Sequence, residues 1–526
     1  MPEMLDQQLK LRVSEAIGRR DFLLAEKLCS EAEANDIAAS EILLVRGALY
    51  SAQGDLERAR SVLAQAYQAM PERGDIAYNY GVVLQQSGRI SEAVEAWKKA
   101  TSRRPQDPAA WLNLALGTLQ LGDAQAALGV YRHALNHHST DRNLLYNYAN
   151  LLFRLGKLDK SERCYNKLLK IHSTDVQARI NYGLLLKTAK RFSESESCYR
   201  QAIALGNPVT APNAYFNLAH LLLQQGNWRE GFAAYEWRLK LPGAIDVPWG
   251  LPEWKPMLPE GSRILLWNDQ GQGDAIMFLR FAALLAQRGY RLFALAQNAL
   301  KALSATAPGI EGSFCPLDEP QDMEAALPLC SLPHALGLES VDVWNGPYLS
   351  AGQKSIVPFA ETTAKRIGIV WAGNPKHSND VNRSMALADF APLFGLPGLE
   401  WYSLQVGPRA AELAASPYRQ RVADLAPSLV DFAATASVLE ELDLLISVDS
   451  APAHLAGAMG KPVWTLLPAV DTDWRWQTNG STPFWYPSMR LFRQARAETW
   501  ASVVATVTDA IRRPAAEARP AVRAAI

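Results

Sequence analysis

The chain has 526 residues, of which 48% are hydrophobic and 20% charged, a composition typical of soluble globular proteins that contain more than one domain. Its 53 basic residues balance its 53 acidic residues, which gives no support to a nucleic-acid partner or a polybasic membrane attachment. The start of the chain is polar, no stretch approaches the roughly 18 apolar residues of a membrane span, and the 5 cysteines form no CxxC pair, so we expect a cytoplasmic protein without a membrane span.

The first half of the chain repeats one turn at a fixed spacing. Successive turns lie 34 residues apart, except that the last follows after 36: Arg20-Asp21, Gly54-Asp55, Gly88-Arg89, Gly122-Asp123, Gly156-Lys157, Lys190-Arg191 and Gly226-Asn227. In each repeat a small residue precedes a larger one by four positions, as Ala93 precedes Trp97. This period and residue order resemble the tetratricopeptide repeat (TPR) family, with about seven repeats. We therefore predict an all-α TPR superhelix over residues 1–240, whose concave face holds a peptide or protein.

An asparagine recurs in the first helix of five of these repeats. The series is Asn79, Asn113, Asn147, Asn181 and Asn217. Asparagine is a mediocre helix former, so its recurrence needs a reason. We interpret the series as an amide ladder that binds the backbone of an acceptor peptide, because the O-GlcNAc transferases, which also carry TPRs, have a similar series. The alternative is that the amides cap or bridge neighbouring repeats.

The second half of the chain has a different pattern. Five prolines in residues 241–261 predict a linker. Short apolar runs then alternate with helical segments, which is typical of parallel sheets covered by helices. We predict two Rossmann-like halves, 262–355 and 356–512, followed by a disordered tail, 513–526. The predicted strands are 263–268, 291–297, 366–373, 401–407, 443–448 and 462–468.

The turn Gly271-Gln272-Gly273-Asp274 follows the first of these strands. Ligands of open α/β sheets bind beyond the carboxyl ends of the strands. The two glycines allow close approach of the backbone to a ligand, and Asp274 could act as a general base. An aspartate that caps a helix is the equally weighted alternative.

A second turn, Asp449-Ser450-Ala451-Pro452-Ala453-His454, follows the strand 443–448. Its free helix-start amides could hold a phosphate, with the Ser450 hydroxyl and His454 as further contacts. The alternative is a helix cap beside a core histidine.

The segment ISVDSAPAHLAGAMGKPVWTLLP (446–468) resembles family 9 glycosyltransferases, the heptosyltransferases, whose motif is D-[ST]-G-x-x-H-x-A. The resemblance spans about residues 262–495, and Ala451 replaces the usual glycine. It implies a GT-B fold, in which two Rossmann-like domains face a cleft, and a nucleotide-sugar donor bound at Asp449, Ser450, Ala451 and His454. It also implies that Asp274, preceded by Gly271 and Gly273, is the base.

The loop after the strand 366–373 carries three further candidate donor-binding residues, Asn374, Lys376 and Arg383. The two cations suit a diphosphate, and the alternative is a solvated loop. Trp474 and Trp476 could line a sugar-binding site, although tryptophans in an apolar run more often belong to a hydrophobic core. Asp471-Thr472-Asp473 matches the DxD motif of metal-dependent GT-A transferases. We do not assign it that role, because the motif lacks its required structural context in a GT-B fold. We therefore predict no metal site and no cofactor, since the nucleotide-sugar is a substrate.

The leading functional hypothesis is a metal-independent glycosyltransferase that modifies a hydroxyl of a protein held by the TPR groove. Bacterial TPR-linked transferases of this architecture include flagellin glycosyltransferases, so flagellin is the expected acceptor. One alternative is an interaction scaffold whose transferase half is inactive. The other is a lipopolysaccharide sugar transferase. The sequence leaves the donor sugar and its nucleotide open.

Overall fold

The computed structural model describes residues 11–34, 38–318, 322–341, 346–355, 357–377, 379–495 and 499–513. The tail predicted for 513–526 therefore lies, from 514 on, outside the described residues. The chain forms two compact units, Met1–Ala189 and Lys190–Ile526. Among the described helices, none combines the length and the apolar character that crossing a membrane requires.

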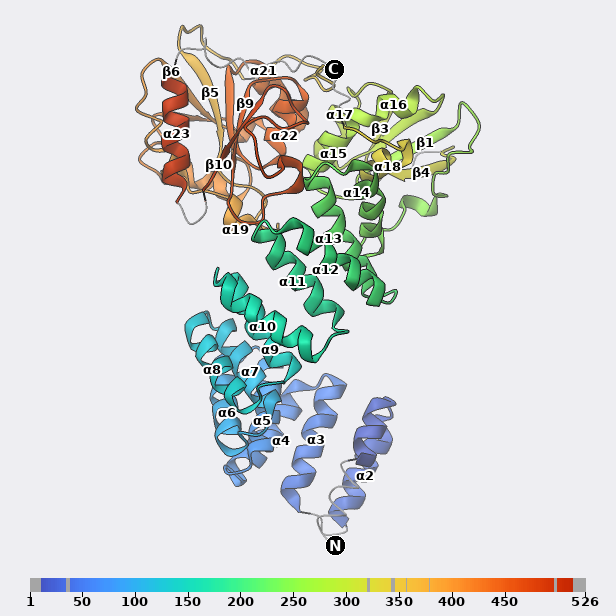
Figure 1. Ribbon diagram of the computed structural model, residues 1–526, viewed down its shortest axis with the longest axis vertical. Coiled ribbons are helices and arrows are strands. Elements are labelled where there is room, and N and C mark those ends of the chain that lie inside the picture. The colour runs from blue at the N-terminus through green and yellow to red at the C-terminus, as the bar shows by residue number, and fades with distance from the viewer. Residues whose placement is uncertain are drawn as a thin grey trace. The chain divides into compact units, whose positions relative to one another are not determined.

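The first unit consists of helices that follow one another at the repeat period (Figure 1). After a helix at residues 11–18 come α2 (Phe22–Ala34), α3 (Ala39–Gln53), α4 (Leu56–Ala69), α5 (Gly74–Gln86), α6 (Ile90–Arg103), α7 (Pro108–Gln120), α8 (Ala124–His137), α9 (Arg142–Arg154), α10 (Leu158–Ile171) and α11 (Val176–Thr188). Each helix packs on its neighbours in the chain. The predicted all-helical superhelix is confirmed for this unit.

The predicted turns have a common backbone conformation. φ is positive at Arg20, Gly54, Gly88, Gly122, Gly156, Lys190 and Gly226. Glycine, which lacks a Cβ, adopts this left-handed region at low cost and ends a helix there. The following residue begins the next helix: the Asp55 carboxylate accepts the N–H of Arg58 at 3.0 Å, and that of Asp123 accepts the N–H of Ala126 at 2.8 Å. A Gly-Asp pair thus both ends one helix and caps the next.

Small residues make room for large ones within a repeat and between neighbouring repeats. A Cβ added to Gly81 would lie 2.5 Å from Nε1 of Trp97, and one added to Gly117 would lie 2.7 Å from Cζ3 of the same ring. Trp97 is fully buried as a result. Substituting either glycine would force the ring out of the gap that it fills.

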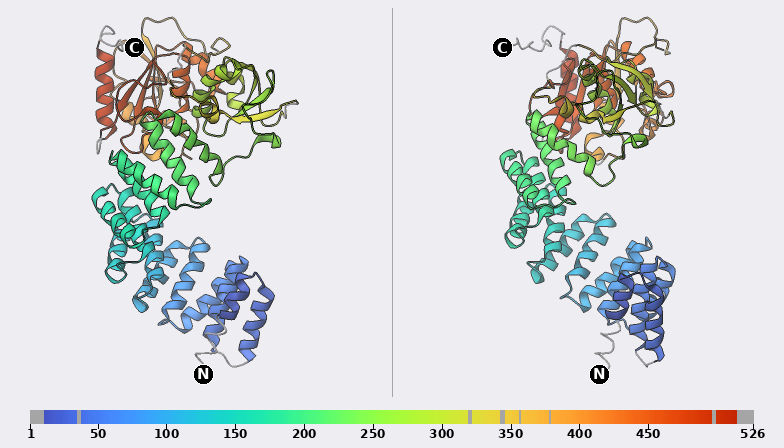
Figure 2. Two further views of the ribbon diagram at one scale, coloured as in Figure 1. Left: turned by 45° about the vertical axis from the view of Figure 1, so that its right-hand side comes forward. Right: turned by 90° about the vertical axis from the view of Figure 1, so that its right-hand side faces the viewer.

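The second unit begins with repeat helices and continues into two parallel sheets (Figure 2). The helical elements are α12 (Phe192–Leu205), α13 (Ala211–Gln224), α14 (Trp228–Tyr235) and the 3-10 turn η1 (Glu236–Lys240). The four-stranded sheet has the order β3-β2-β1-β4, and the six-stranded sheet has the order β10-β9-β8-β5-β6-β7. Their strands are β1 (Arg263–Trp267), β2 (Arg291–Leu295), β3 (Ile310–Phe314), β4 (Ala325–Pro328), β5 (Lys365–Val370), β6 (Leu399–Ser403), β7 (Val422–Asp424), β8 (Leu444–Val448), β9 (Val463–Leu467) and β10 (Met489–Arg493). The prediction of parallel sheets with helices is confirmed, whereas β3, β4, β7 and β10 were not predicted.

Helices cover the faces of these sheets. Those that matter for the site are α15 (Gln272–Phe278), which follows β1, and α22 (Ala451–Ala458), which follows β8. In Figure 1, α22 and α21 (Phe432–Glu440) lie on one face of the six-stranded sheet and α23 (Trp500–Arg512) on the other. Alternate residues of β8 point to opposite faces, so that Leu445 joins the core with α22 and Ile446 joins the core with α23.

The last repeat shares its core with the sheet region. Phe232 of α14 contacts Trp474 edge-on, with 6.2 Å between ring centroids, and Trp228 contacts Trp485 at 5.6 Å. All four rings belong to one buried cluster with α15 and α22. The apolar face of the final helix pair is therefore covered by the second half of the chain.

Candidate active site

Three loops leave their sheets where the strand order reverses. In the four-stranded sheet β1 lies between β2 and β4, and in the six-stranded sheet β5 lies beside β8. Crevices at such reversals are the usual ligand sites of open α/β sheets. Asp274 lies in the first turn of α15, which follows β1, and Arg383 ends the short helix α19 (Asp380–Arg383), which follows β5. Asp449 lies in the loop after β8. The topology thus places the predicted site residues where binding is expected.

The first turn of α15 fixes the Asp274 carboxylate. Oδ2 accepts the N–H of Gly271 at 3.0 Å, three residues upstream. The N-cap of α15 is Gly271 and Asp274 is its third residue, so Asp274 satisfies the helix start from inside the first turn, whereas the capping interpretation places it at the N-cap. Oδ1 accepts a hydrogen bond from Arg475, whose guanidinium forms an ion pair with it. Both carboxylate oxygens are therefore hydrogen-bonded, and 21% of the Asp274 side chain is exposed to solvent.

Arg475 lies in the 3-10 turn η8 (Trp474–Trp476), which follows β9. Its Nη1 donates to both oxygens of Asp473, at 2.7 and 2.9 Å. The Asp473 carboxylate also accepts the backbone N–H of Arg475 at 3.0 Å, so that it begins the turn. The result is a row of charges, Asp473, Arg475 and Asp274, in which one cation faces two carboxylates.

Side-chain hydrogen bonds of two serines hold the turn after β8. The hydroxyls of Ser447 and Ser450 lie 2.8 Å apart, and the Ser447 hydroxyl donates to the carbonyl of Val448 at 2.7 Å. Ser450 precedes the first residue of α22, Ala451. At this helix start the N–H of Ala453 donates to the Ser450 carbonyl at 3.0 Å, and Pro452 has no N–H. Phosphate binding here would rest on the amides of Ser450 and Ala451, and it stays a prediction.

His454 is buried at the centre of the site. Its Nδ1 lies 3.0 Å from the Tyr486 hydroxyl, its Nε2 lies 3.9 Å from Oδ1 of Asp449, and its ring stacks on Trp476 with 5.0 Å between centroids. The core-histidine part of the alternative describes this packing, whereas the Ser450 side chain at the N-cap makes no hydrogen bond to the helix start. The same packing also fixes the imidazole beside the Asp449 carboxylate.

The turns at 271–274 and 449–454 meet directly. A Cβ added to Gly273 would lie 2.9 Å from Cδ2 of His454 and 3.6 Å from Cα of Ala451. The first turns of α15 and α22 therefore touch at a point where only glycine fits. The structure thus brings Gly271, Gly273 and Asp274 together with Ser450, Ala451 and His454.

Burial governs the proton affinities of this site. It lowers the pKa of His454 to about 3, helped by the positive charge of Arg475, so the imidazole is neutral. Burial also raises the pKa of Asp274 and of Asp449. For Asp473 the same effect is outweighed by Arg475, and its pKa is lowered. Asp274 and Asp449 thus have the raised proton affinities that acid–base chemistry uses.

The residues predicted in the loop after β5 have different environments. Arg383 is held close to the site: its guanidinium packs on Gly373, its Nε lies 3.3 Å from Oδ1 of Asp380, and its side chain is 12% exposed. Asn374 accepts the N–H of Lys376 in a local turn, and both residues are exposed. The positive charge of Arg383 acts to lower the pKa of Asp449 and of His454, so Arg383 lies near the cluster. Asn374 and Lys376 lie on the surface.

The five asparagines of the repeats are all half-buried. The side-chain amides of Asn79, Asn147 and Asn217 donate to backbone carbonyls one turn earlier, at 2.8 to 2.9 Å. Asn181 instead donates to Tyr146 and Asn150 of the preceding repeat, and Asn113 bonds to the Tyr78 side chain. Only Asn113 and Asn181 therefore bridge neighbouring repeats, while the other three bond within their own helix. The use of these amides by an acceptor peptide stays a prediction.

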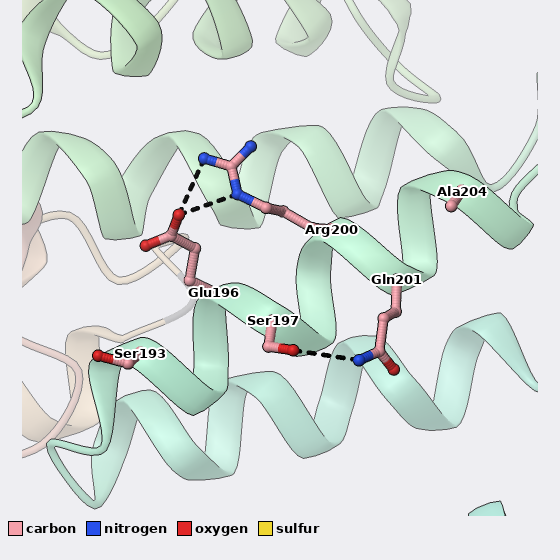
Figure 3. Close-up of a pocket in the computed structure, with 6 residues that line it drawn as sticks. All are labelled: Ser193, Glu196, Ser197, Arg200, Gln201 and Ala204. Atoms are coloured by element: carbon pink, nitrogen blue, oxygen red, sulfur yellow. Dashed lines mark hydrogen bonds and ion pairs between the residues drawn. The ribbon is translucent and has the colours of Figure 1, made fainter.

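A polar hollow lies along α12 (Figure 3). It is lined by Ser193, Glu196, Ser197, Arg200, Gln201 and Ala204. Arg200 is paired with Glu196 at 2.8 Å and with Glu230 at 2.7 Å. The arginine is thus already neutralised, and the hollow lacks the buried acid–base groups of the loops described above.

Sequence reasoning missed the central cation of the site. Trp474 and Trp476 are buried as core residues, and Asp473, part of the rejected DxD, is paired with Arg475. Within the described residues, no group of three or more His, Cys, Asp or Glu side chains could hold a metal ion. The signal for Arg475 was its position, two residues after an aspartate in the segment that follows β9.

Two protein-family models match this chain, one in the helical repeats and the other in the sheet region. Residues 50–116 and 118–180 match the family model of the tetratricopeptide repeat. Residues 404–474 match that of glycosyltransferase family 9 (heptosyltransferase), a stretch that includes the turn at 449–454 and stops before Arg475.

Among characterised proteins, the chain is similar to Protein FlbA of Caulobacter vibrioides, with 24% identity over 349 residues. The match covers 58% of this chain and 56% of FlbA, so the chain spans little more than half of that relative. Solved structures similar to it include MamA (18% identity, 32% of this chain and 91% of that chain, TM-score 0.30) and pilF of Pseudomonas aeruginosa (15%, 39% and 93%, TM-score 0.35). The family matches indicate that the chain carries tetratricopeptide repeats and a glycosyltransferase family 9 domain.

Proposed function

We propose that the protein is a GT-B glycosyltransferase that moves a sugar from a nucleotide-sugar to a hydroxyl of a protein acceptor. The observation that carries the proposal is the direct contact between the turn at 271–274 and the turn at 449–454. This contact brings a carboxylate of raised pKa to the helix start at which a phosphate would bind. The family 9 match over 404–474 and the TPR match support the two halves of the proposal.

In this proposal Asp274 accepts the proton of the acceptor hydroxyl as the anomeric carbon loses its phosphate. The amides at the start of α22 and the guanidinium of Arg383 stabilise the charge of the leaving nucleotide diphosphate. His454 stays neutral and can hold a phosphate or ribose oxygen only as a hydrogen-bond partner. No step in this scheme needs a metal or a cofactor.

Tetratricopeptide repeats bind peptides or proteins, which makes a protein the favoured acceptor. Flagellin is the candidate acceptor, through the resemblance to TPR-linked flagellin glycosyltransferases. The test is intact-protein mass spectrometry of flagellin after incubation with this protein and a panel of nucleotide-sugars. We expect the mass to increase by whole sugar residues with the wild type and to stay unchanged with Asp274→Asn.

Asp509→Asn is the matched control, because it removes an exposed aspartate carboxylate on α23. It should transfer sugar as the wild type does. Absence of any mass increase, with wild-type protein and every donor of the panel, would contradict transfer to flagellin.

A scaffold with an inactive transferase half is the second candidate. It is favoured by one observation, the engagement of both Asp274 oxygens by Gly271 and Arg475. The two candidates differ in donor hydrolysis. A transferase slowly hydrolyses its nucleotide-sugar in the absence of acceptor and loses this activity in Asp274→Asn, whereas a scaffold binds its partner equally well with either residue and hydrolyses nothing.

A further inference from the structure

Arg475 joins the two sheet halves at the site. Asp274 belongs to α15 of the four-stranded half, whereas Arg475 lies 201 residues further along the chain, after β9 of the six-stranded half. Its guanidinium also lies over the ring of Trp474, 4.4 Å from the centroid, and the residue is 7% exposed. A buried arginine that bridges carboxylates of two halves is costly unless its geometry is fixed.

We propose that Arg475 is the positioning residue for the Asp274 carboxylate: anchored on Asp473, it holds the base of one half against the other half. This inference rests on the proposed function, because it assigns Arg475 a role in the reaction that Asp274 performs. It adds a residue that lies outside the matched stretch 404–474.

The geometry gives each partner a separate task. Asp473 takes one side of the guanidinium through two hydrogen bonds and also begins the turn η8, so it fixes Arg475 to its own half. Nη2 of Arg475 is left to face Oδ1 of Asp274. Because Oδ2 is already held by the N–H of Gly271, the contact with Arg475 leaves the carboxylate a single orientation.

The charges around Asp274 determine what removal of Arg475 would do. Asp473 from η8 and Asp269 from the loop after β1 raise the pKa of Asp274 further, beyond the effect of burial, whereas Arg475 lowers it. Of the other groups that face it, His454 of α22 is neutral, and Tyr235 and Cys330 have strongly raised pKa values through burial and are also neutral. His377, whose own pKa is lowered by burial, is a further titratable neighbour.

The first experiment measures kcat/KM for sugar transfer against pH. In Arg475→Gln we expect the acid limb to move upward by about one to three pH units, because the opposite charge beside the carboxylate is lost. Arg475→Lys, which keeps the charge, should return most of this shift. The double variant Arg475→Gln/Asp473→Asn removes the unpaired Asp473 charge and should show a smaller shift than Arg475→Gln alone.

The second experiment needs no activity and so separates this inference from the proposed function. In protein labelled with ¹³C-aspartate, the Asp274 carboxyl signal is assigned by its loss in Asp274→Asn. Its titration midpoint should rise in Arg475→Gln and return toward the wild-type value in Arg475→Lys. An unchanged midpoint in folded Arg475→Gln would overturn the inference even if sugar transfer is found, whereas a shifted midpoint without sugar transfer would contradict only the proposed function.

Discussion

The side chains of Arg238 and Asp269 form an ion pair with 2.6 Å between Nε and Oδ2, and they are only 1% and 2% exposed. Arg238 lies in η1, the 3-10 turn that follows the last repeat helix, and Asp269 lies in the loop that leads from β1 to α15. The guanidinium also donates to Ser331 at 2.8 Å. The helical repeats are thus joined to the loop of the candidate base by a bond buried from water.

Breaking this pair on one side should destabilise the second unit strongly. In Arg238→Met the Asp269 carboxylate stays buried without its cation, and we expect unfolding to require about 3–5 kcal/mol less free energy. The double variant Arg238→Met/Asp269→Leu leaves only Glu236 without its cation, a carboxylate that is 25% exposed and keeps its hydrogen bond from Ser331, so it should recover much of the loss. Urea unfolding followed by tryptophan fluorescence measures both, and an equal loss in the single and double variants would contradict an electrostatic cause.

The last repeat should be indispensable to the sheet region. A chain that begins at Lys190 keeps Trp228 and Phe232 and should unfold cooperatively. A chain that begins at Leu241 lacks them, so the buried faces of Trp474 and Trp485 become exposed. We expect the shorter chain to bind a hydrophobic dye and to melt without cooperativity. Equal melting temperatures of the two chains would contradict the shared core.

Much of this architecture was readable in the sequence, and what was not has a physical reason. The repeat turns and the central strands are local signals, such as the positive-φ glycine at Gly54 or the apolar run of β8. The pair between Arg475 and Asp274 joins residues 201 positions apart, and no local pattern records it. The strand β7 was missed because it is three residues long and mostly exposed.

The contact between α15 and α22 should make Gly273 sensitive to a single methyl group. In Gly273→Ala the new Cβ would stand 2.9 Å from His454, closer than such atoms approach in proteins. We expect a stability loss of about 1–3 kcal/mol and a fall in sugar transfer of about 100-fold, because the base moves relative to the donor. Gly395→Ala is the matched control, since nothing lies within 4 Å of its Cβ position. Full transfer by Gly273→Ala would show that the two turns can separate without cost.

The buried neutral His454 should make stability depend on pH. Burial lowers its pKa from 6.5 to about 3 in the folded protein, so the folded state resists a proton that the unfolded chain binds below pH 6.5. The stability that a neutral imidazole contributes is therefore complete above pH 6.5 and is lost, at up to about 1.4 kcal/mol per pH unit, as the pH falls toward 3.

The comparison that isolates this effect is between the wild type and His454→Asn, whose amide can still reach the Tyr486 hydroxyl. The variant loses the stacking on Trp476 at every pH, and this loss lowers its free energy of unfolding by a constant amount. The difference in the free energy of unfolding should nevertheless shrink by about 2 kcal/mol between about pH 7.5 and about pH 5. His334→Asn, at an exposed histidine of the same unit, is the matched control. If the wild-type and His454→Asn curves run parallel over this range, the imidazole accepts its proton without unfolding, and the packing against Trp476 and Tyr486 does not keep it neutral.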